Sequence, residues 1–243
     1  IDTVMSSELR AYDTNRWGED ALETLHGNKS HISYISHLAW MICGYKSVGG
    51  DDRYDAVLSK LCETMNRRIL SSSSFNLPTY PGESIYVPDM LVAIVALKQY
   101  SQMTDNRYSS TVDKWLARAQ REWLDEESGL LVSFLGEDGT QYTDAPVKGS
   151  YSALNCYYLT LIDPTFANEQ YRLLKKHLWR DNFIPGLCEY KEWTPVFGLD
   201  VDAGPLVFGL SPSGTAFLTG SATYFEDFAT RTHLLTTADY GYA

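Results

Sequence analysis

The sequence lacks the motifs that mark several large functional classes. It has no GxGxxG, P-loop, GxSxG or HExxH pattern, so it does not support a nucleotide cofactor or the common hydrolase and metalloprotease sites. Lys and Arg number 20 against 31 Asp and Glu, which gives a formal net charge of -11. Because such a field repels polyanions, we expect no nucleic-acid partner and no binding to anionic membrane surfaces.

Long apolar runs and paired cysteines are also missing. The longest helical apolar run, at residues 87–97, is too short to cross a bilayer and contains Asp89, so no membrane span is expected. The four cysteines have no CxxC spacing, and three of them fall in predicted helices. This pattern indicates buried thiols and argues against a zinc site.

The chain begins at Ile1, without a charged and apolar leader. This start predicts either a leader that has been removed, which favours a periplasmic or extracellular location, or the C-terminal part of a longer chain. The 243 residues, with 44% hydrophobic and 21% charged side chains, predict a folded single domain over residues 1–243. The 17 Tyr and 6 Trp suit flat ligands such as sugars, although many Tyr simply lie between core and solvent.

The main signal is a repeat of an apolar helix, a short polar turn and an amphipathic helix. Apolar segments at residues 33–45 and 85–100 are followed by the similar turns 51–54 (DDRY) and 105–108 (DNRY). A third apolar segment, residues 151–162, precedes a predicted turn that ends at Tyr171. Self-similarity at this period is typical of stacked helical pairs.

Residues 204–224 predict a fourth apolar helix, which is followed by a last helix that runs towards Ala243. The first helix of each pair is apolar on most sides and the second only on one stripe, which predicts buried and solvent-facing helices respectively. The sequence thus predicts an all-α fold of helix hairpins that form an α/α toroid. A full ring has about six hairpins. We therefore expect either a missing N-terminal segment that completes the ring or a free-standing arc.

Three long connections lead into the later apolar helices, and we expect them on one face. They cover residues 71–83, 125–150 and 180–203, and the second predicts a small β-hairpin within residues 130–143. Long loops above the ends of rigid helices are where binding sites are expected. This face is the predicted ligand face.

Each of these connections carries a carboxylate just before an apolar helix. Glu83, Asp144, and the pair Asp200 and Asp202 hold these positions. Because free N–H groups and the helix dipole favour an ionised carboxylate, we take Glu83, Asp200 and Asp202 as candidate catalytic bases, nucleophiles or charge stabilisers.

Structural readings of the same carboxylates stay open. Asp200 and Asp202 could bind sugar hydroxyls, activate water or hold Ca²⁺, or Asp202 could cap the helix whose first turn carries Pro205. No other cofactor is expected. Glu83 could be a structural helix-start residue. Asp89 lies inside an apolar helix, where it needs a partner, and faces either a central cavity or a structural Arg.

Aromatic residues flank these carboxylates and predict stacking walls for a ligand, although several of them belong to the core. The predicted substrate-binding residues are Tyr80, Tyr86, Asp144, Tyr151 and Trp193.

The hairpin repeat resembles the six-hairpin α/α toroid superfamily of glycoside hydrolases, polysaccharide lyases and sugar epimerases. Residues 49–54 (GGDDRY) and 79–83 (TYPGE) are also similar to the linalool dehydratase/isomerase-like group, in which a cysteine precedes the matching glutamate where this chain has Gly82. That departure puts terpene-alcohol chemistry in doubt, and the resemblance carries over only Glu83.

Three functions follow as alternatives. The first is a carbohydrate-active enzyme, a hydrolase or a lyase, that uses the candidate carboxylates on a glycan. The second is a dehydratase/isomerase that acts on a small alcohol. The third is a non-catalytic binding or scaffold toroid. An open groove lined by aromatic residues would favour glycans, a small closed apolar pocket would favour the second, and carboxylates all engaged in caps would favour the third.

Overall fold

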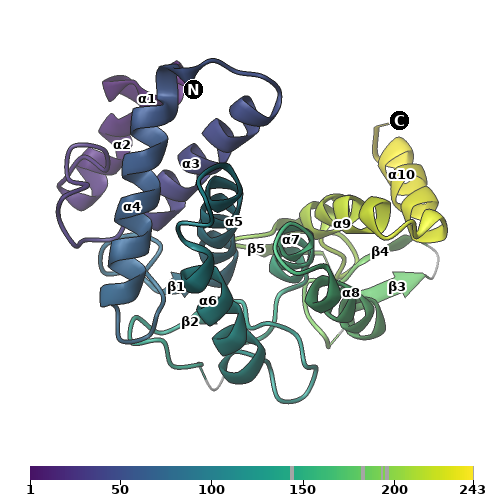
Figure 1. Ribbon diagram of the computed structural model, residues 1–243. Helices are drawn as coiled ribbons and strands as arrows, with labels where there is room; N and C mark the ends of the chain where they lie inside the picture. The colour runs from purple at the N-terminus through teal and green to yellow at the C-terminus, as the bar shows by residue number, and fades with distance from the viewer. Residues whose placement is uncertain (143–144, 182–183, 193, 195–196, 243) are drawn as a thin grey trace. The chain divides into compact units, whose positions relative to one another are not determined.

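The computed structural model describes residues 1–142, 145–181, 184–192, 194 and 197–242 (Figure 1). Over these residues helices dominate, and the strands form only two-stranded sheets. The chain divides into two compact units. Unit 1 comprises Ile1–Arg118 and Phe134–Tyr142, and unit 2 comprises Ala119–Ser133 and Thr143–Ala243. This division leaves the prediction of a single domain over residues 1–243 open.

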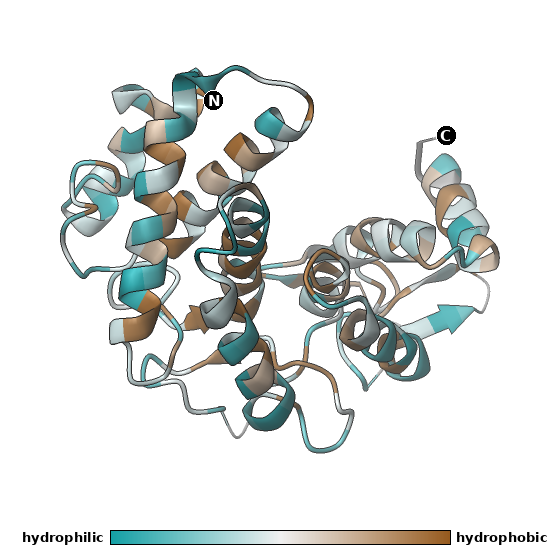
Figure 2. Ribbon diagram, in the orientation of Figure 1, coloured by the Kyte–Doolittle hydropathy of each residue, from teal (hydrophilic) through white to brown (hydrophobic). Residues whose placement is uncertain are grey.

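Unit 1 is built around the apolar helices α3 and α5, which lie side by side and both contact α4. α5 is buried along most of its length, and Figure 2 shows it mainly in the colour of hydrophobic residues. Pro88 stands in its first turn, where a missing N–H costs no hydrogen bond. The elements of unit 1 are α1 (Asp2–Met5), α2 (Ser7–Trp17), α3 (Ile32–Ser47), a 3-10 turn (Asp52–Tyr54), α4 (Asp55–Ser71), β1 (Ile85–Tyr86), α5 (Val87–Met103) and β2 (Phe134–Leu135), and α6 (Ser109–Glu122) crosses into unit 2.

Unit 2 repeats the arrangement with α7 packed between α8 and α9, and α9 contacts α10. Two glycines of α9 allow the close approach to α7. A Cβ on Gly214 would lie 3.0 Å from the backbone of Ser150, and one on Gly220 would lie 2.8 Å from the ring of Tyr157. The elements of unit 2 are α7 (Gly149–Thr160), α8 (Pro164–Leu178), β3 (Trp179–Asp181), β4 (Pro185–Leu187), β5 (Gly198–Asp200), β6 (Gly204–Leu206), α9 (Pro212–Tyr224) and α10 (Phe228–Tyr242).

The two matching turns have a physical basis in their residue types. Asp105 and Asn106 adopt positive φ angles of 47° and 61°, which Asp and Asn tolerate better than most residues. Tyr54 and Tyr108, the last residues of the two tetrapeptides, are both buried. The polar turn therefore ends on an aromatic anchor, as the repeat predicts. The third turn was predicted wrongly, because Asp163 caps α8 and places Tyr171 inside that helix.

The predicted start of the fourth apolar helix is also wrong. Residues 204–206 form β6, which pairs with β5, and the helix begins at Pro212, where the Ser211 hydroxyl accepts the N–H of Gly214 at 3.0 Å. Asp202 therefore does not cap a helix that contains Pro205. The small β-hairpin predicted within residues 130–143 is confirmed: Leu135 and Gln141 form an antiparallel bridge across the turn at residues 136–139, and β2 also pairs with β1.

The membrane and cysteine predictions can be compared with the same residues. No helix in the described ranges is long and apolar enough to span a membrane. All four cysteines are free and buried, as their spacing indicates.

Candidate functional sites

The first candidate site lies in unit 1, where α3 and α5 begin. Asp89 stands in the first turn of α5, and Ser33, in the first turn of α3, donates a hydrogen bond to its Oδ1 at 3.2 Å. Thr79 also hydrogen-bonds to the Asp89 carboxylate, while its Oγ1 accepts the N–H of Tyr86 at 3.1 Å. Two hydroxyl groups from different segments therefore fix this carboxyl group.

The surroundings favour the protonated form of Asp89. Burial raises the pKa of its carboxyl group, and the negative charge of Glu83 raises it further. The charge of His37 and the hydrogen bonds from Thr79 and Ser33 lower the pKa, but they do not reverse the shift. The sequence left open whether Asp89 faces a cavity or a structural Arg; its partners here are hydroxyl groups and a histidine.

Glu83 lies in the loop before β1, and α5 begins four residues after it. Its backbone N–H closes a turn onto the carbonyl of Tyr80 at 3.1 Å. Within the described ranges, the half-buried Glu83 carboxylate makes no hydrogen bond or ion pair. Glu83 is thus not the helix-start residue, and its side chain has no structural partner in that part of the chain.

An aromatic wall stands beside these carboxyl groups. The rings of Trp17 and Tyr80 stack with centroids 3.7 Å apart and an interplanar angle of 6°. His31 meets Tyr80 edge-on at 6.0 Å. Burial raises the pKa of Tyr80 to about 12, so its hydroxyl stays protonated and shares a hydrogen bond with Ser33. We call Asp89, Ser33, Thr79, Tyr80 and Glu83 the Asp89 cluster.

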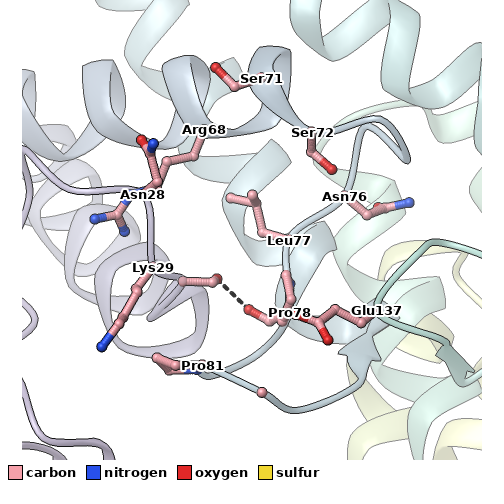
Figure 3. A pocket seen from close by; sticks show the side chains of 12 residues that line it. Asn28, Lys29, Arg68, Ser71, Ser72, Asn76, Leu77, Pro78, Pro81 and Glu137 are labelled. Carbon is pink, nitrogen blue, oxygen red and sulfur yellow. Dashed lines mark hydrogen bonds between the residues drawn. The ribbon is translucent and has the colours of Figure 1, made fainter.

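A polar pocket lies on the same loop, which contributes Pro81 and Gly82 to its lining (Figure 3). Its volume is about 580 Å³. Hydroxyl, amide and charged side chains make up most of the lining, with Leu77 and the prolines as apolar contributions. The residues that line it are Asn28, Lys29, Ser30, Arg68, Ser71, Ser72, Asn76, Leu77, Pro78, Pro81, Gly82 and Glu137.

The second candidate site lies in unit 2, where β5 faces the start of α7. The ammonium group of Lys148 contacts both carboxylate oxygens of Asp200, at 3.0 and 2.9 Å, and also Asp202. Tyr190 donates a further hydrogen bond to Asp200. The backbone N–H groups of Asp202 and Ala203 donate to the same carboxylate at 2.9 and 2.8 Å. These residues form the Lys148 network.

This network holds its charges firmly. Burial raises the pKa of Asp200, but the hydrogen bonds from Tyr190, the Ala203 N–H and Lys148 outweigh it and hold the pKa at about 2. Burial lowers the pKa of Lys148, yet the two carboxylates outweigh that effect and raise it. The Asp200 side chain is only 7% exposed, whereas Asp202 keeps 20%. Asp202 is therefore the more accessible of the pair.

A buried acid adjoins the Lys148 network. Glu189 is fully buried, and its carboxylate accepts the N–H of Ser150 at 3.1 Å and the hydroxyl of Ser150 at 2.8 Å. Burial raises the pKa of Glu189, although the bonds to Ser150 oppose the shift. Gly149 allows this close approach, because a Cβ there would lie 1.9 Å from the carbonyl oxygen of Cys188.

The structure distributes the predicted site residues between the units. Tyr80, Glu83 and Tyr86 belong to unit 1, whereas Tyr151, Asp200 and Asp202 belong to unit 2. Their common cavity therefore stays a prediction. Tyr86 packs edge-on against Phe134 at 4.9 Å, and the Tyr151 ring lies 5.9 Å from the Lys148 ammonium. Asp144 and Trp193 lie outside the described residues.

The sequence indicated the candidate carboxylates but not the side chains that bind them, namely Lys148, Ser33 and Thr79. Lys148 was the one signal available for the Lys148 network, since it is the only basic residue in residues 142–151. Ser33 and Thr79 carry no such signal, because hydroxyl residues are common near helix starts.

The Lys148 ammonium group competes with the Ca²⁺ ion that the sequence allows at Asp200 and Asp202. The Lys148 ammonium lies between the two carboxylates, where a cation would bind, so Ca²⁺ would have to displace it. No group of three or more His, Cys, Asp or Glu in the described ranges is arranged to hold a metal ion.

Comparison with known proteins gives matches among solved structures only. No protein-family profile matches the sequence. No curated protein matches it either. An inactive double-aspartate variant of the α-1,6-mannanase GH76A of Salegentibacter sp., in complex with α-1,6-mannotetrose, matches with a TM-score of 0.53 and 15% identity over 87% of this chain and 60% of that chain. A second inactive variant, with α-1,6-mannotriose, gives a TM-score of 0.52 at the same identity and coverage.

A glycoside hydrolase from family 105 of C. acetobutylicum matches with a TM-score of 0.58 and 12% identity over 85% of this chain and 62% of that chain. This chain therefore spans about three fifths of the length of the structures it matches. None of these three is a linalool dehydratase/isomerase, so that resemblance stays a prediction. Both the mannanase and the family 105 enzyme are α/α toroids, and the likeness shows that this chain has an α/α toroid fold.

Proposed function

We propose that the chain is a carbohydrate-active enzyme, a glycoside hydrolase or a lyase, that binds its glycan along the loop containing Tyr80 and Glu83. The observation that carries the proposal is the half-buried Glu83 carboxylate, which has no hydrogen-bond or ion-pair partner within the described ranges. A carboxylate without such partners keeps both of its oxygens able to accept hydrogen bonds from the hydroxyl groups of a ligand.

Two neighbouring features support a sugar as the ligand. The Trp17–Tyr80 stack offers an aromatic surface of the kind that packs on sugar rings. The polar pocket lined by Pro81 and Gly82 offers hydroxyl and amide groups that match sugar hydroxyls. A small closed apolar pocket would instead have favoured the dehydratase/isomerase alternative, whereas the pocket lined by Pro81 and Gly82 is open and has mostly polar residues in its lining.

We propose different roles for Asp200 and Asp202. Asp200 has the Lys148 ammonium, Tyr190 and two backbone N–H groups as partners, an arrangement that favours a positioning role over that of a base. Asp202 is more exposed and is the better candidate for contact with a glycan. Tyr151, Tyr86, Asp144 and Trp193 remain proposed binding residues.

The test is turnover and binding on a glycan panel that includes α-1,6-mannotriose and α-1,6-mannotetrose, the ligands seen in the matching mannanase structures. We expect Glu83→Gln to lower turnover at least about a hundredfold with little change in melting temperature. Glu63→Gln, which alters an exposed glutamate of α4, is the matched control and should change neither. A parent chain that neither binds nor cleaves any glycan of the panel would favour the scaffold alternative.

A further inference from the structure

The loop before β1 carries Tyr80 and Glu83 on a tight turn that its residue types favour. The N–H of Glu83 donates to the carbonyl of Tyr80 at 3.1 Å, which closes a four-residue β-turn. Pro81 and Gly82 are its two central residues, and Gly82 has a φ angle of 77°. This is the pattern of a type II turn, in which Pro fixes the first central φ and Gly accepts the positive second one. The turn therefore holds the backbones of Tyr80 and Glu83 close together.

Thr79, the residue before this turn, closes the loop at its base. Its N–H donates to the carbonyl of Ser84 at 3.1 Å, and its carbonyl accepts the N–H of Ser33, in α3, at 3.4 Å. Its hydroxyl oxygen accepts the N–H of Tyr86, in β1, at 3.1 Å. The same hydroxyl group hydrogen-bonds the carboxyl group of Asp89, in the first turn of α5. Thr79 thus ties the two ends of the turn to each other and to α3, β1 and α5.

Thr79 and Glu83 differ in accessibility and in partners. Thr79 is only 4% exposed. Glu83 is half-buried, and in the described part of the chain its carboxylate makes no hydrogen bond or ion pair. Because no side-chain bond holds this carboxylate, its place depends on the turn that carries it. A group that acts on a ligand must be held near its working position, since a displacement of about 1 Å can cost about a hundredfold in rate.

We propose that Thr79 is a positioning residue: it fixes the turn of residues 80–83 and thereby the Glu83 carboxylate that the proposed function assigns to the glycan. This inference rests on the proposed function and adds to it a residue that does not itself touch the ligand. Thr79→Val removes the hydroxyl bonds to Tyr86 and Asp89 and keeps the shape of the side chain. Thr79→Ser keeps the hydroxyl group and is the conservative variant.

Turnover of a glycan that the parent chain cleaves tests the effect on the site, at a temperature where all variants are folded. We expect Thr79→Val to lower kcat/KM at least about tenfold, and Thr79→Ser to stay within about threefold of the parent. Thr111→Val is the matched control, because Thr111 is 5% exposed and its hydroxyl donates to Asn66 at 2.6 Å. This control should lower the melting temperature as Thr79→Val does, yet leave kcat/KM within about twofold of the parent.

Amide hydrogen exchange tests the turn itself, without any glycan. In Thr79→Val we expect faster exchange of the Glu83 N–H, because this N–H keeps its own acceptor and so reports on the turn rather than on the deleted bonds. Thr111→Val should not change that exchange. Unchanged exchange of the Glu83 N–H in Thr79→Val, or an unchanged kcat/KM, would overturn this inference while leaving the proposed function standing. A parent chain that cleaves no glycan overturns the proposed function, and the role of Thr79 falls with it.

Discussion

The carboxyl groups near the starts of the apolar helices differ between the two units. In unit 1, Asp89 is bound by the hydroxyl groups of Ser33 and Thr79, and its pKa is raised. In unit 2, Asp200 is bound by the Lys148 ammonium and by N–H donors, and its pKa is held at about 2. The pKa values of the two carboxyl groups are thus shifted in opposite directions.

The difference shows that the helix start does not decide the charge of a carboxyl group. Helix N-termini favour anions by a modest amount, about 0.3–1 kcal/mol at exposed sites. Burial without a cation outweighs that amount at Asp89, whereas a buried ammonium reverses the balance at Asp200. The Asp200 carboxylate of unit 2 is therefore held in an ion pair, whereas the Asp89 carboxyl group of unit 1 has a hydroxyl donor in Ser33.

The largest effect is expected when the Lys148 ammonium group is removed. Lys148→Met should destabilise the protein by about 3–5 kcal/mol, because it leaves the Asp200 charge buried without its partner. Urea unfolding at neutral pH measures the effect. Lys114→Met on the exposed face of α6 is the control and should stay within about 0.5 kcal/mol. Partial recovery in the double variant Lys148→Met, Asp200→Asn is expected, and equal loss in the single and double variants would contradict the network.

The next test compares two helical glycines, one from each unit. Gly149→Ala should cost about 3 kcal/mol, the upper end of overpacking, because its Cβ would meet the Cys188 carbonyl oxygen at 1.9 Å. Gly44→Ala in α3 meets nothing within 4 Å and should stabilise by about 0.5–1 kcal/mol. We expect the melting temperature to fall in Gly149→Ala and to rise in Gly44→Ala. A neutral Gly149→Ala would show that the start of α7 has room to move.

A matched pair of isosteric changes gives a smaller effect. Asp200→Asn should cost about 1.5–3 kcal/mol, because hydrogen bonds to a charged carboxylate are lost. Asp89→Asn should leave stability at neutral pH unchanged or slightly higher, since it replaces a group that is costly to ionise in place. Equal losses in the two variants would remove the distinction between the units.

The pH dependence of stability should separate the same two groups. Asp200 has a folded pKa below its unfolded value of about 3.9, so its stabilisation is present above that pH and is lost as the pH falls towards about 2. Asp89 has a raised folded pKa, so its contribution is present at low pH and is lost as the pH rises through that value. Unfolding curves of the parent and of both Asn variants, recorded across pH, measure the two pH-dependent changes in stability. If both changes persist in Asp200→Asn and in Asp89→Asn, the two carboxyl groups are not their cause.

The smallest effect is expected at the exposed end of the Lys148 network. Asp202→Ala should cost no more than about 1 kcal/mol, because an accessible ion pair is screened by solvent. Thermal unfolding at low and high salt measures it, with the smaller loss expected at high salt. A cost as large as that of Asp200→Asn would show that both carboxylates share the structural role.

The sequence predicted much of the fold because its signals are local. The apolar runs of α3, α5 and α7 and the two Asp-rich turns repeat within the chain, and helix formation depends mainly on residues three and four positions apart. The prediction failed at residues 204–206, which look helical but form a tight hairpin with β5, because strand pairing with a neighbouring segment competes with helix formation. The pairing of β2 with β1, 50 residues away along the chain, was not predicted, because no local pattern specifies it.

The sequence by itself placed Glu83 before the apolar helix α5, but it wrongly placed Asp200 and Asp202 at a helix start, because residues 198–200 and 204–206 form a hairpin. Only the tertiary structure decided what each of them does. Lys148 and Asp200 are 52 residues apart, and Ser33 and Asp89 are 56 apart. The charge of a buried carboxyl group depends on the donor that folding brings within about 3 Å, and no local spacing in a sequence specifies that donor.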